Sequence, residues 1–198
     1  MARPRQFDED AVLEAVRDQF WDAGYAATSL QDLMRVTGLG KGSLYAAFGD
    51  KHALYLTVLR RYSDGGDRSV RDMLGTTRRA VDALWAYLMA PIGDLDGTAA
   101  ARGCMLANGT CELATADPDV RDVARQTYDS ITDALADCVR RAQAQGDLPA
   151  GPEPLETARA LLAAQQGLVY MGRTGMDVAT LDATARSLAA SLLHGFRP

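Results

Sequence analysis

The chain has 198 residues, 47% of them hydrophobic, and carries a formal net charge of −5. This length and apolar content suffice for a core without disulfide staples, and no apolar run approaches the roughly 20 residues that span a bilayer. The N-terminus lacks the apolar stretch of a secretion signal, so we expect a soluble cytoplasmic protein without membrane association.

The net negative charge argues against a protein that coats nucleic acid through bulk attraction. The charge is uneven, however, because residues 1–61 hold 8 Lys and Arg against 8 Asp and Glu, whereas residues 62–198 hold 13 against 18. A locally positive surface is therefore compatible with the first part of the chain. Cys104, Cys111 and Cys138 have neither C-x-x-C spacing nor neighbouring histidines, so we expect reduced thiols and no metal site.

Apolar residues recur at spacings of three and four, without the alternation of strands, so we expect an all-helical fold. The first predicted helix covers about residues 8–23 and ends before Gly24, which suits a left-handed position. Thr28 and Gln31 fit a capping box that starts a short second helix. Gly38 ends this second helix.

A very short third helix is predicted over residues 41–47, and Asp50 then caps a long fourth helix. The stretch GLGKGSLYAAFGDK at residues 38–51 has the ingredients of a nucleotide-binding loop. Neither the Walker spacing nor G-x-G-x-x-G fits, because Lys41 is followed by Gly42 and a capped helix precedes them instead of a strand. No cofactor is therefore expected. Two helices joined by a glycine-containing turn instead predict a helix-turn-helix.

The same stretch resembles the signature of the tetracycline-repressor (TetR) type of bacterial regulator. That signature reads approximately G-[YF]-x-x-[TS]-[ST]-[VIML]-x-x-[IL], then G-[VL]-x-x-[GP]-[ST]-[LIF]-Y-x-x-F-x-x-K-x-x-L. The matching residues are Gly24, Tyr25, Thr28, Ser29, Leu30, Leu33, Gly38, Leu39, Gly42, Ser43, Leu44, Tyr45, Phe48, Lys51 and Leu54. So many matches at fixed spacing are specific, although they are confined to roughly residues 8–60.

The resemblance implies that the third helix is a recognition helix and that neighbouring helix starts hold the DNA backbone. The implied DNA contacts are Thr28, Ser29, Lys41, Gly42, Ser43, Tyr45 and Lys51. Leu44 and Phe48 are expected to face the core instead. Arg3 and Arg5 lie in an arm that either reaches an adjacent groove or is disordered.

The rest of the chain reads as a second helical domain that begins near Gly75. The expected domains are a helix-turn-helix domain at 1–50, a connecting helix at 51–74, and a ligand-binding and dimerisation domain at 75–198. The last two predicted helices are apolar and rich in alanine, and the resemblance assigns them to a homodimer that reads two half-sites. The alternative is that these helices only close the core of their own chain.

Large apolar groups with a few polar anchors indicate an effector pocket in the second domain, with ordinary core packing as the alternative. The candidate pocket residues are Trp85, Met89, Met105, Asn108, Glu112, Tyr128 and Tyr170. A small apolar or amphipathic effector would bind there and shift the fourth helix. Cys104 follows Arg102 at a predicted helix start, which offers redox or electrophile sensing as a second hypothesis, with a buried structural cysteine as the alternative.

We therefore expect a dimeric, non-catalytic regulator that binds a double-stranded DNA operator, and the resemblance implies repression and release by a small-molecule inducer. Two other classes are alternatives. An all-helical enzyme would use Glu112, His194 and a cysteine, but no nucleophile, base and orienting group stand at interpretable spacing. A protein-binding module would leave Lys41 and Lys51 without anionic partners.

Overall fold

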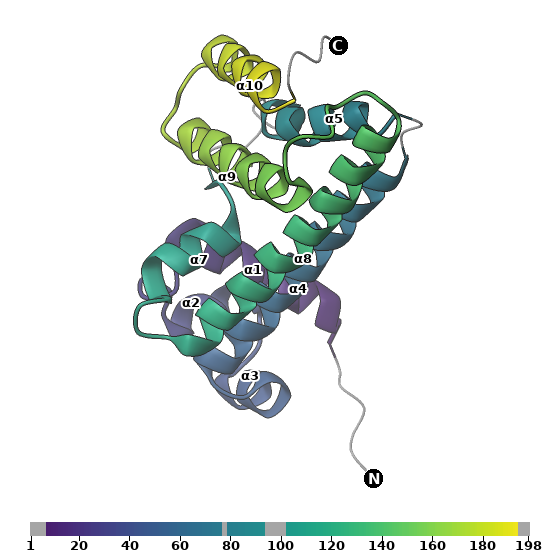
Figure 1. The fold of residues 1–198 in the computed structure, drawn as a ribbon. Helices are drawn as coiled ribbons and strands as arrows, with labels where there is room; N and C mark the ends of the chain where they lie inside the picture. The colour runs from purple at the N-terminus through teal and green to yellow at the C-terminus, as the bar shows by residue number, and fades with distance from the viewer. Residues whose placement is uncertain (1–6, 77–78, 94–101, 194–198) are drawn as a thin grey trace. The chain divides into compact units, whose positions relative to one another are not determined.

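The computed structural model describes residues 7–76, 79–93 and 102–193. These residues form nine helices and no strand, which confirms the predicted all-helical fold (Figure 1). None of the described helices is both long enough and apolar enough to cross a membrane. Arg3, Arg5 and His194, to which sequence analysis gave roles, lie outside the described residues.

The helices group into two compact units. The N-terminal unit falls within Met1–Asp64 and Met105–Ala124, and the C-terminal unit within Gly65–Cys104 and Arg125–Pro198. The N-terminal unit holds α1 (Glu9–Ala23), α2 (Leu30–Thr37), α3 (Lys41–Phe48), the first half of α4 (Lys51–Thr76), α7 (Met105–Leu113) and the start of α8 (Pro118–Ala144). A segment from the predicted second domain thus packs with the helix-turn-helix, which the sequence did not suggest.

The ends of the first helices follow local chemistry. The Asp8 side chain accepts hydrogen bonds from the backbone amides of Asp10 and Ala11 and so caps α1, which ends at Gly24 with a φ of 83°. Gly38 is left-handed, with a φ of 68°, and ends α2 as predicted. Asp50 Oδ1 accepts from the amide of Ala53 at 2.8 Å, which confirms the predicted cap of α4.

The predicted capping box of Thr28 and Gln31 is wrong, and the true box lies one residue further on. Ser29 Oγ accepts from the amide of Asp32 at 3.1 Å, and Asp32 Oδ2 accepts from the amide of Ser29 at 3.0 Å. The reason is that Thr28 is buried and its hydroxyl donates to the carbonyl of Gly24 at 2.7 Å, so it packs instead of capping.

The core of the N-terminal unit is made by leucine, valine and aromatic side chains from α1 to α4. Leu44 is 1% exposed, which confirms its predicted inward position, while Phe48 is half-buried and lies 6.3 Å from the Phe7 ring. The fully buried positions of α1 and α2 are Val16 and Leu33. Leu44, together with the half-buried Phe48, thus anchors the eight-residue α3, whose first residues Lys41, Gly42 and Ser43 stay exposed.

The C-terminal unit has a larger apolar core. It contains the end of α4, α5 (Ala80–Gly93), most of α8, α9 (Pro154–Arg173) and α10 (Val178–Leu192). Leu84, Leu88, Leu135 and Leu161 are completely buried in one cluster, and α5, α9 and α10 pack against one another (Figure 1). Cys138 is buried in this core, while all three cysteines are free thiols.

Candidate DNA-binding surface

Four of the predicted DNA contacts lie within the first five residues of α3. Lys41, Gly42, Ser43 and Tyr45 are all exposed, although Leu44 between them is buried. The Lys41 ammonium lies 5.6 Å from the centroid of the Tyr45 ring. Because Leu44 fixes the rotation of the helix, its cationic and hydroxyl groups must point outward.

The N-terminus of α3 is open to an anionic partner. Gly40 occupies the cap position and provides no side-chain hydrogen bond to the helix. A Cβ atom added at Gly42 would meet nothing within 4 Å, so the fold itself does not require glycine there. A helix N-terminus with a small residue lets the backbone amides approach a phosphate closely, where the helix dipole favours negative charge.

Two further helix starts flank α3. Ser29 is exposed at the cap of α2, and Lys51 is the first residue of α4. The Lys51 ammonium lies 4.3 Å from the centroid of the Tyr25 ring, a distance at which the ring attracts and orients the charge. The Thr28 side chain, by contrast, is buried and its hydroxyl donates to the Gly24 carbonyl, so Thr28 is not among the DNA contacts that we propose.

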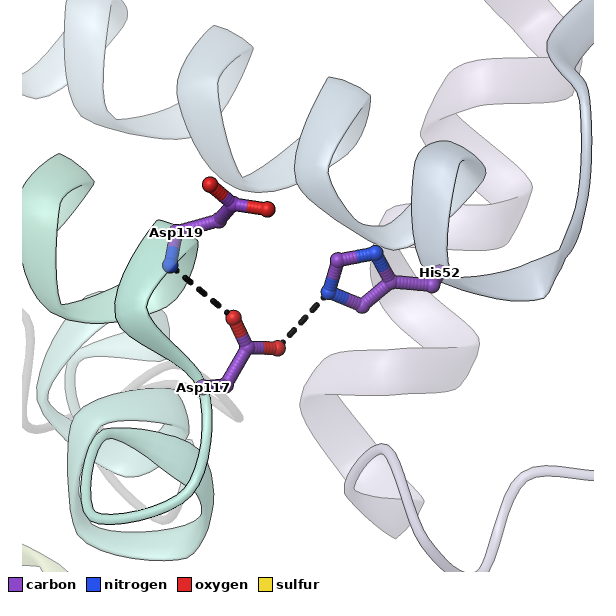
Figure 2. Close-up of side chains that lie close together, drawn as sticks. All are labelled: His52, Asp117 and Asp119. Atoms are coloured by element: carbon purple, nitrogen blue, oxygen red, sulfur yellow. Dashed lines mark hydrogen bonds and ion pairs between the residues drawn. The ribbon is translucent and has the colours of Figure 1, made fainter.

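His52 follows Lys51 and is held by an acid from α8. His52 Nε2 and Asp117 Oδ2 lie 2.7 Å apart, and Asp117 Oδ1 accepts from the amides of Asp119 and Val120 (Figure 2). Burial alone would raise the pKa of the Asp117 carboxyl, but the bond to His52 and the amide bonds outweigh it and lower the pKa overall. Asp117 therefore caps α8.

The side chains of His52, Asp117 and Asp119 offer ligand atoms that lie within 4.8 Å of one another. In Figure 2, the Asp117 carboxylate lies between the His52 ring and the backbone nitrogen of Asp119. Because the positive end of the α8 dipole stabilises this carboxylate and opposes a cation, we interpret the group as a hydrogen-bonded helix cap.

Glu112 on α7 makes a contact that the sequence did not reveal. Its Oε2 accepts from the amide of Tyr25 at 2.9 Å, and its Oε1 accepts from the amide of Ala26 at 2.7 Å. The carboxylate thus holds the turn between α1 and α2. No sequence pattern signals this contact, because 86 residues separate Glu112 from Ala26.

The predicted effector-pocket residues are divided between the two units. Met105, Asn108 and Glu112 belong to the N-terminal unit, and Trp85, Met89, Tyr128 and Tyr170 to the C-terminal unit. Tyr170 is 70% exposed, and the Arg186 guanidinium lies 5.5 Å from the centroid of the Trp85 ring. Burial, together with nearby Tyr128 and Cys104, raises the pKa of Tyr87 in the C-terminal unit.

An exposed, basic helix start on a short helix that follows a glycine turn, with two further helix starts beside it, defines a helix-turn-helix DNA-binding protein. Comparison with known families agrees with this class. The family model described as "Bacterial regulatory proteins, tetR family" matches residues 12–58, and the model "Tetracyclin repressor-like, C-terminal domain" matches residues 80–188. The chain belongs to the TetR family of DNA-binding transcriptional regulators, which is not a family of enzymes.

Individual relatives cover nearly the whole chain. The HTH-type transcriptional repressor ComR of Escherichia coli (strain K12) is 29% identical over 90% of this chain and 86% of ComR. The uncharacterized HTH-type transcriptional regulator YezE of Bacillus subtilis (strain 168) is 26% identical over 92% of this chain and 94% of YezE. The structure of a cysteine mutant of the TetR family regulator CifR, complexed with 26bp double-strand operator DNA, has a TM-score of 0.82 and 27% identity, and covers 96% of this chain and 99% of CifR.

Proposed function

We propose that this protein is a repressor that binds a pseudo-palindromic operator as a homodimer and is released by a small-molecule effector. The observation that carries the DNA-binding part is the exposed start of α3, where Lys41, Gly42, Ser43 and Tyr45 are all exposed while Leu44 is buried. The repressor name of ComR and the operator complex of CifR support repression through an operator.

The chemistry of each group suggests its target on the duplex. Lys41 and Ser43 stand at the start of α3, from where a side chain reaches base edges in the major groove. Tyr45, Ser29 and Lys51 offer a phenol, a helix N-terminus and an ammonium, which suit phosphate oxygens. The phosphate contacts position α3, and the contacts to base edges select the sequence.

Selection of random duplex DNA with the purified protein tests this function. The expected product is an inverted repeat whose half-sites lie about one helical turn, or a multiple of it, apart. Enrichment of no sequence, or of single-stranded DNA only, contradicts the proposal. A reporter gene placed behind the selected site then distinguishes repression from activation.

Dimerisation through α9 and α10 is supported by two uncharged stripes in the C-terminal unit, which consist mostly of small residues. On α9 the stripe consists of Ala163, Gly167 and Tyr170, at helical spacings of four and three. On α10 a shallow groove is lined by Ala179, Thr180, Ala183, Thr184, Ser187 and Leu188. Neither stripe carries a charge, and small residues let the helices of two chains approach closely.

Replacing Ala183 by Arg places a charge in the middle of the α10 stripe and tests the dimer. Light scattering is expected to find a dimer for the parent protein and a monomer for Ala183→Arg at micromolar concentration. The matched control is Ala144→Arg, because Ala144 is exposed near the end of α8 and outside both stripes. A monomeric parent protein, or a dimeric Ala183→Arg variant, contradicts the assignment.

The effector part of the proposal is centred on the C-terminal unit. Tyr87 is 2% exposed and lies near enough to Tyr128 and Cys104 for both to affect its phenol. An aromatic surrounding with a few polar atoms suits a small amphipathic molecule. A compound that raises the melting temperature and weakens DNA binding identifies the effector, and both effects are expected to decline in Tyr87→Phe if the phenol binds it.

Redox or electrophile sensing through Cys104 is a second candidate function. Cys104 is half-buried at the start of α7, and Cys111 is exposed on the same helix. If oxidant releases DNA from the parent and from Cys104→Ser equally, Cys104 is not the sensor.

A further inference from the structure

Residues 105–124, comprising α7 and the first turns of α8, contact the α1–α2 turn through Glu112 and the start of α4 through Gly109 and Asp117. We name this segment the brace. We propose that Glu112 of the brace is a positioning residue for DNA binding, because it fixes the turn that places Ser29 and Lys51. This inference rests on the proposed function, since it assumes that the protein binds an operator. It adds a residue outside the helix-turn-helix to the groups that determine operator affinity.

The Glu112 carboxylate binds the α1–α2 turn with both of its oxygens. Both of its oxygens accept backbone hydrogen bonds, from Tyr25 at 2.9 Å and Ala26 at 2.7 Å. The approach is close, because a Cβ atom on Gly24 would lie 3.0 Å from Glu112 Oε2. Hydrogen bonds to a charged acceptor are stronger than neutral ones, and here two of them act on adjacent amides of one turn.

The turn held by Glu112 connects directly to two of the proposed phosphate contacts. Along the chain, Ala26 is followed three residues later by Ser29, the exposed cap of α2. Through space, the Tyr25 ring lies 4.3 Å from the Lys51 ammonium. The backbone amide of Tyr25 donates to Glu112, and the ring of Tyr25 contacts the Lys51 ammonium. A displaced turn would therefore move both Ser29 and Lys51.

The other two brace contacts hold the start of α4. A Cβ atom on Gly109 would lie only 2.1 Å from Tyr55 Oη, so α7 and α4 pack together at van der Waals distance. The bond between Asp117 and His52 fixes the residue that follows Lys51. These two contacts hold α4, whereas the Glu112 bonds act directly on the α1–α2 turn.

Operator affinity of Glu112 variants gives a test in which positioning and simple electrostatics predict opposite signs. Loss of a carboxylate near a DNA-binding surface should by charge alone strengthen DNA binding. If Glu112 positions the turn, Glu112→Ala should instead weaken binding about tenfold, since two charge-assisted hydrogen bonds are lost. Glu112→Gln keeps one acceptor oxygen and should lie between Ala and the parent.

The matched control is Glu14→Ala, which removes the same charge from an exposed position on α1. This control should bind the operator as tightly as the parent or more tightly. Binding by Glu112→Ala that equals or exceeds that of Glu14→Ala overturns the proposal, as does equal weakening in Glu112→Gln and Glu112→Ala.

A second measurement requires no DNA and therefore separates failure of this inference from failure of the proposed function. Amide hydrogen exchange by NMR should be faster at Tyr25 and Ala26 in Glu112→Gln than in the parent, and unchanged at Leu84 in the core of the other unit. Unchanged exchange at both Tyr25 and Ala26 would overturn the inference even if the parent binds an operator.

Discussion

The two units of this molecule are stabilised in different ways. In the N-terminal unit, hydrogen bonds between distant segments fix the helix ends, as in the bonds of Glu112 to Tyr25 and of Asp117 to His52. The C-terminal unit has hydrogen-bonded helix ends too, as in the cap of α10 by Asp177, and its helices α5, α9 and α10 pack through two clusters of buried, mostly aliphatic side chains. The comparison teaches that the predicted DNA contacts lie at helix ends whose position depends on a few polar bonds, whereas the helices of the other unit meet along buried faces.

The largest expected effect is on the packing of α7 against α4. Gly109→Ala places a methyl group 2.1 Å from Tyr55 Oη and should destabilise the N-terminal unit by about 2 kcal/mol, the usual cost of overpacking a core. Tyr55→Phe should restore much of this loss in the double variant, because the next atom of the ring lies at 3.4 Å. Urea denaturation measures both.

The matched control for Gly109→Ala is Gly66→Ala in α4, where an added Cβ atom meets nothing within 4 Å. This change should stabilise the protein by about 0.5–1 kcal/mol, since alanine favours a helix. If Gly109→Ala has the same effect as Gly66→Ala, the close contact between α7 and α4 is refuted.

The next prediction separates folding from DNA binding on α3. Gly42→Ala should raise stability by about 0.5–1 kcal/mol, because the site has open space and alanine favours the helix. The same methyl group should weaken operator binding about tenfold if the α3 backbone approaches the DNA closely. Undiminished affinity, measured by fluorescence anisotropy, would show that glycine at 42 has no part in DNA contact.

A smaller effect is expected for one phosphate contact. Lys51→Ala should reduce the slope of log affinity against log salt by about one unit, because one fewer counterion is released. The matched control is Arg140→Ala, an exposed cation on α8 whose partner is Asp137. An unchanged slope in Lys51→Ala, or an equal change in Arg140→Ala, is incompatible with the assignment of Lys51 to a phosphate.

The smallest effect concerns the pH dependence of the α2 cap. Hydrogen bonds from the Ser29 side chain and amide, with help from Arg35, lower the pKa of Asp32 from 3.8 to about 2. A lowered pKa means that the cap contributes its full stability above pH 3.8 and loses it as the pH falls towards 2. NMR titration of the Asp32 carboxyl carbon should show this low midpoint, and Ser29→Ala should raise it; a midpoint near 3.8 in the parent contradicts the box.

Sequence patterns predicted the elements of the DNA-binding unit well, since its signals are local. Gly38 and Asp50 act within a few residues of their own position, and the inward place of Leu44 follows from helical spacing. The cap of α2 was misplaced by one residue, because Thr28 and Ser29 both fit a cap and only the packing of Thr28 decides between them.

Contacts between distant segments could not be predicted in the same way. Glu112 was assigned to an effector pocket because it shares a helical face with Met105, and nothing near it in sequence points to the amides of Tyr25 and Ala26. Backbone amides are present at every non-proline position, so a carboxylate that binds them leaves no pattern of residue types. The predicted pocket combined residues of both units, because their residue types do not show which segments pack together.

The central claim, that α3 and not the C-terminal unit meets DNA, is tested most directly by photo-crosslinking. Benzoylphenylalanine would replace either Tyr45 or Tyr170, which are 37% and 70% exposed. The account predicts that irradiation with the selected duplex crosslinks DNA at position 45, while position 170 crosslinks only to a second copy of the protein. Accessibility alone would favour position 170, so DNA crosslinks at 170, or none at 45, would contradict the account.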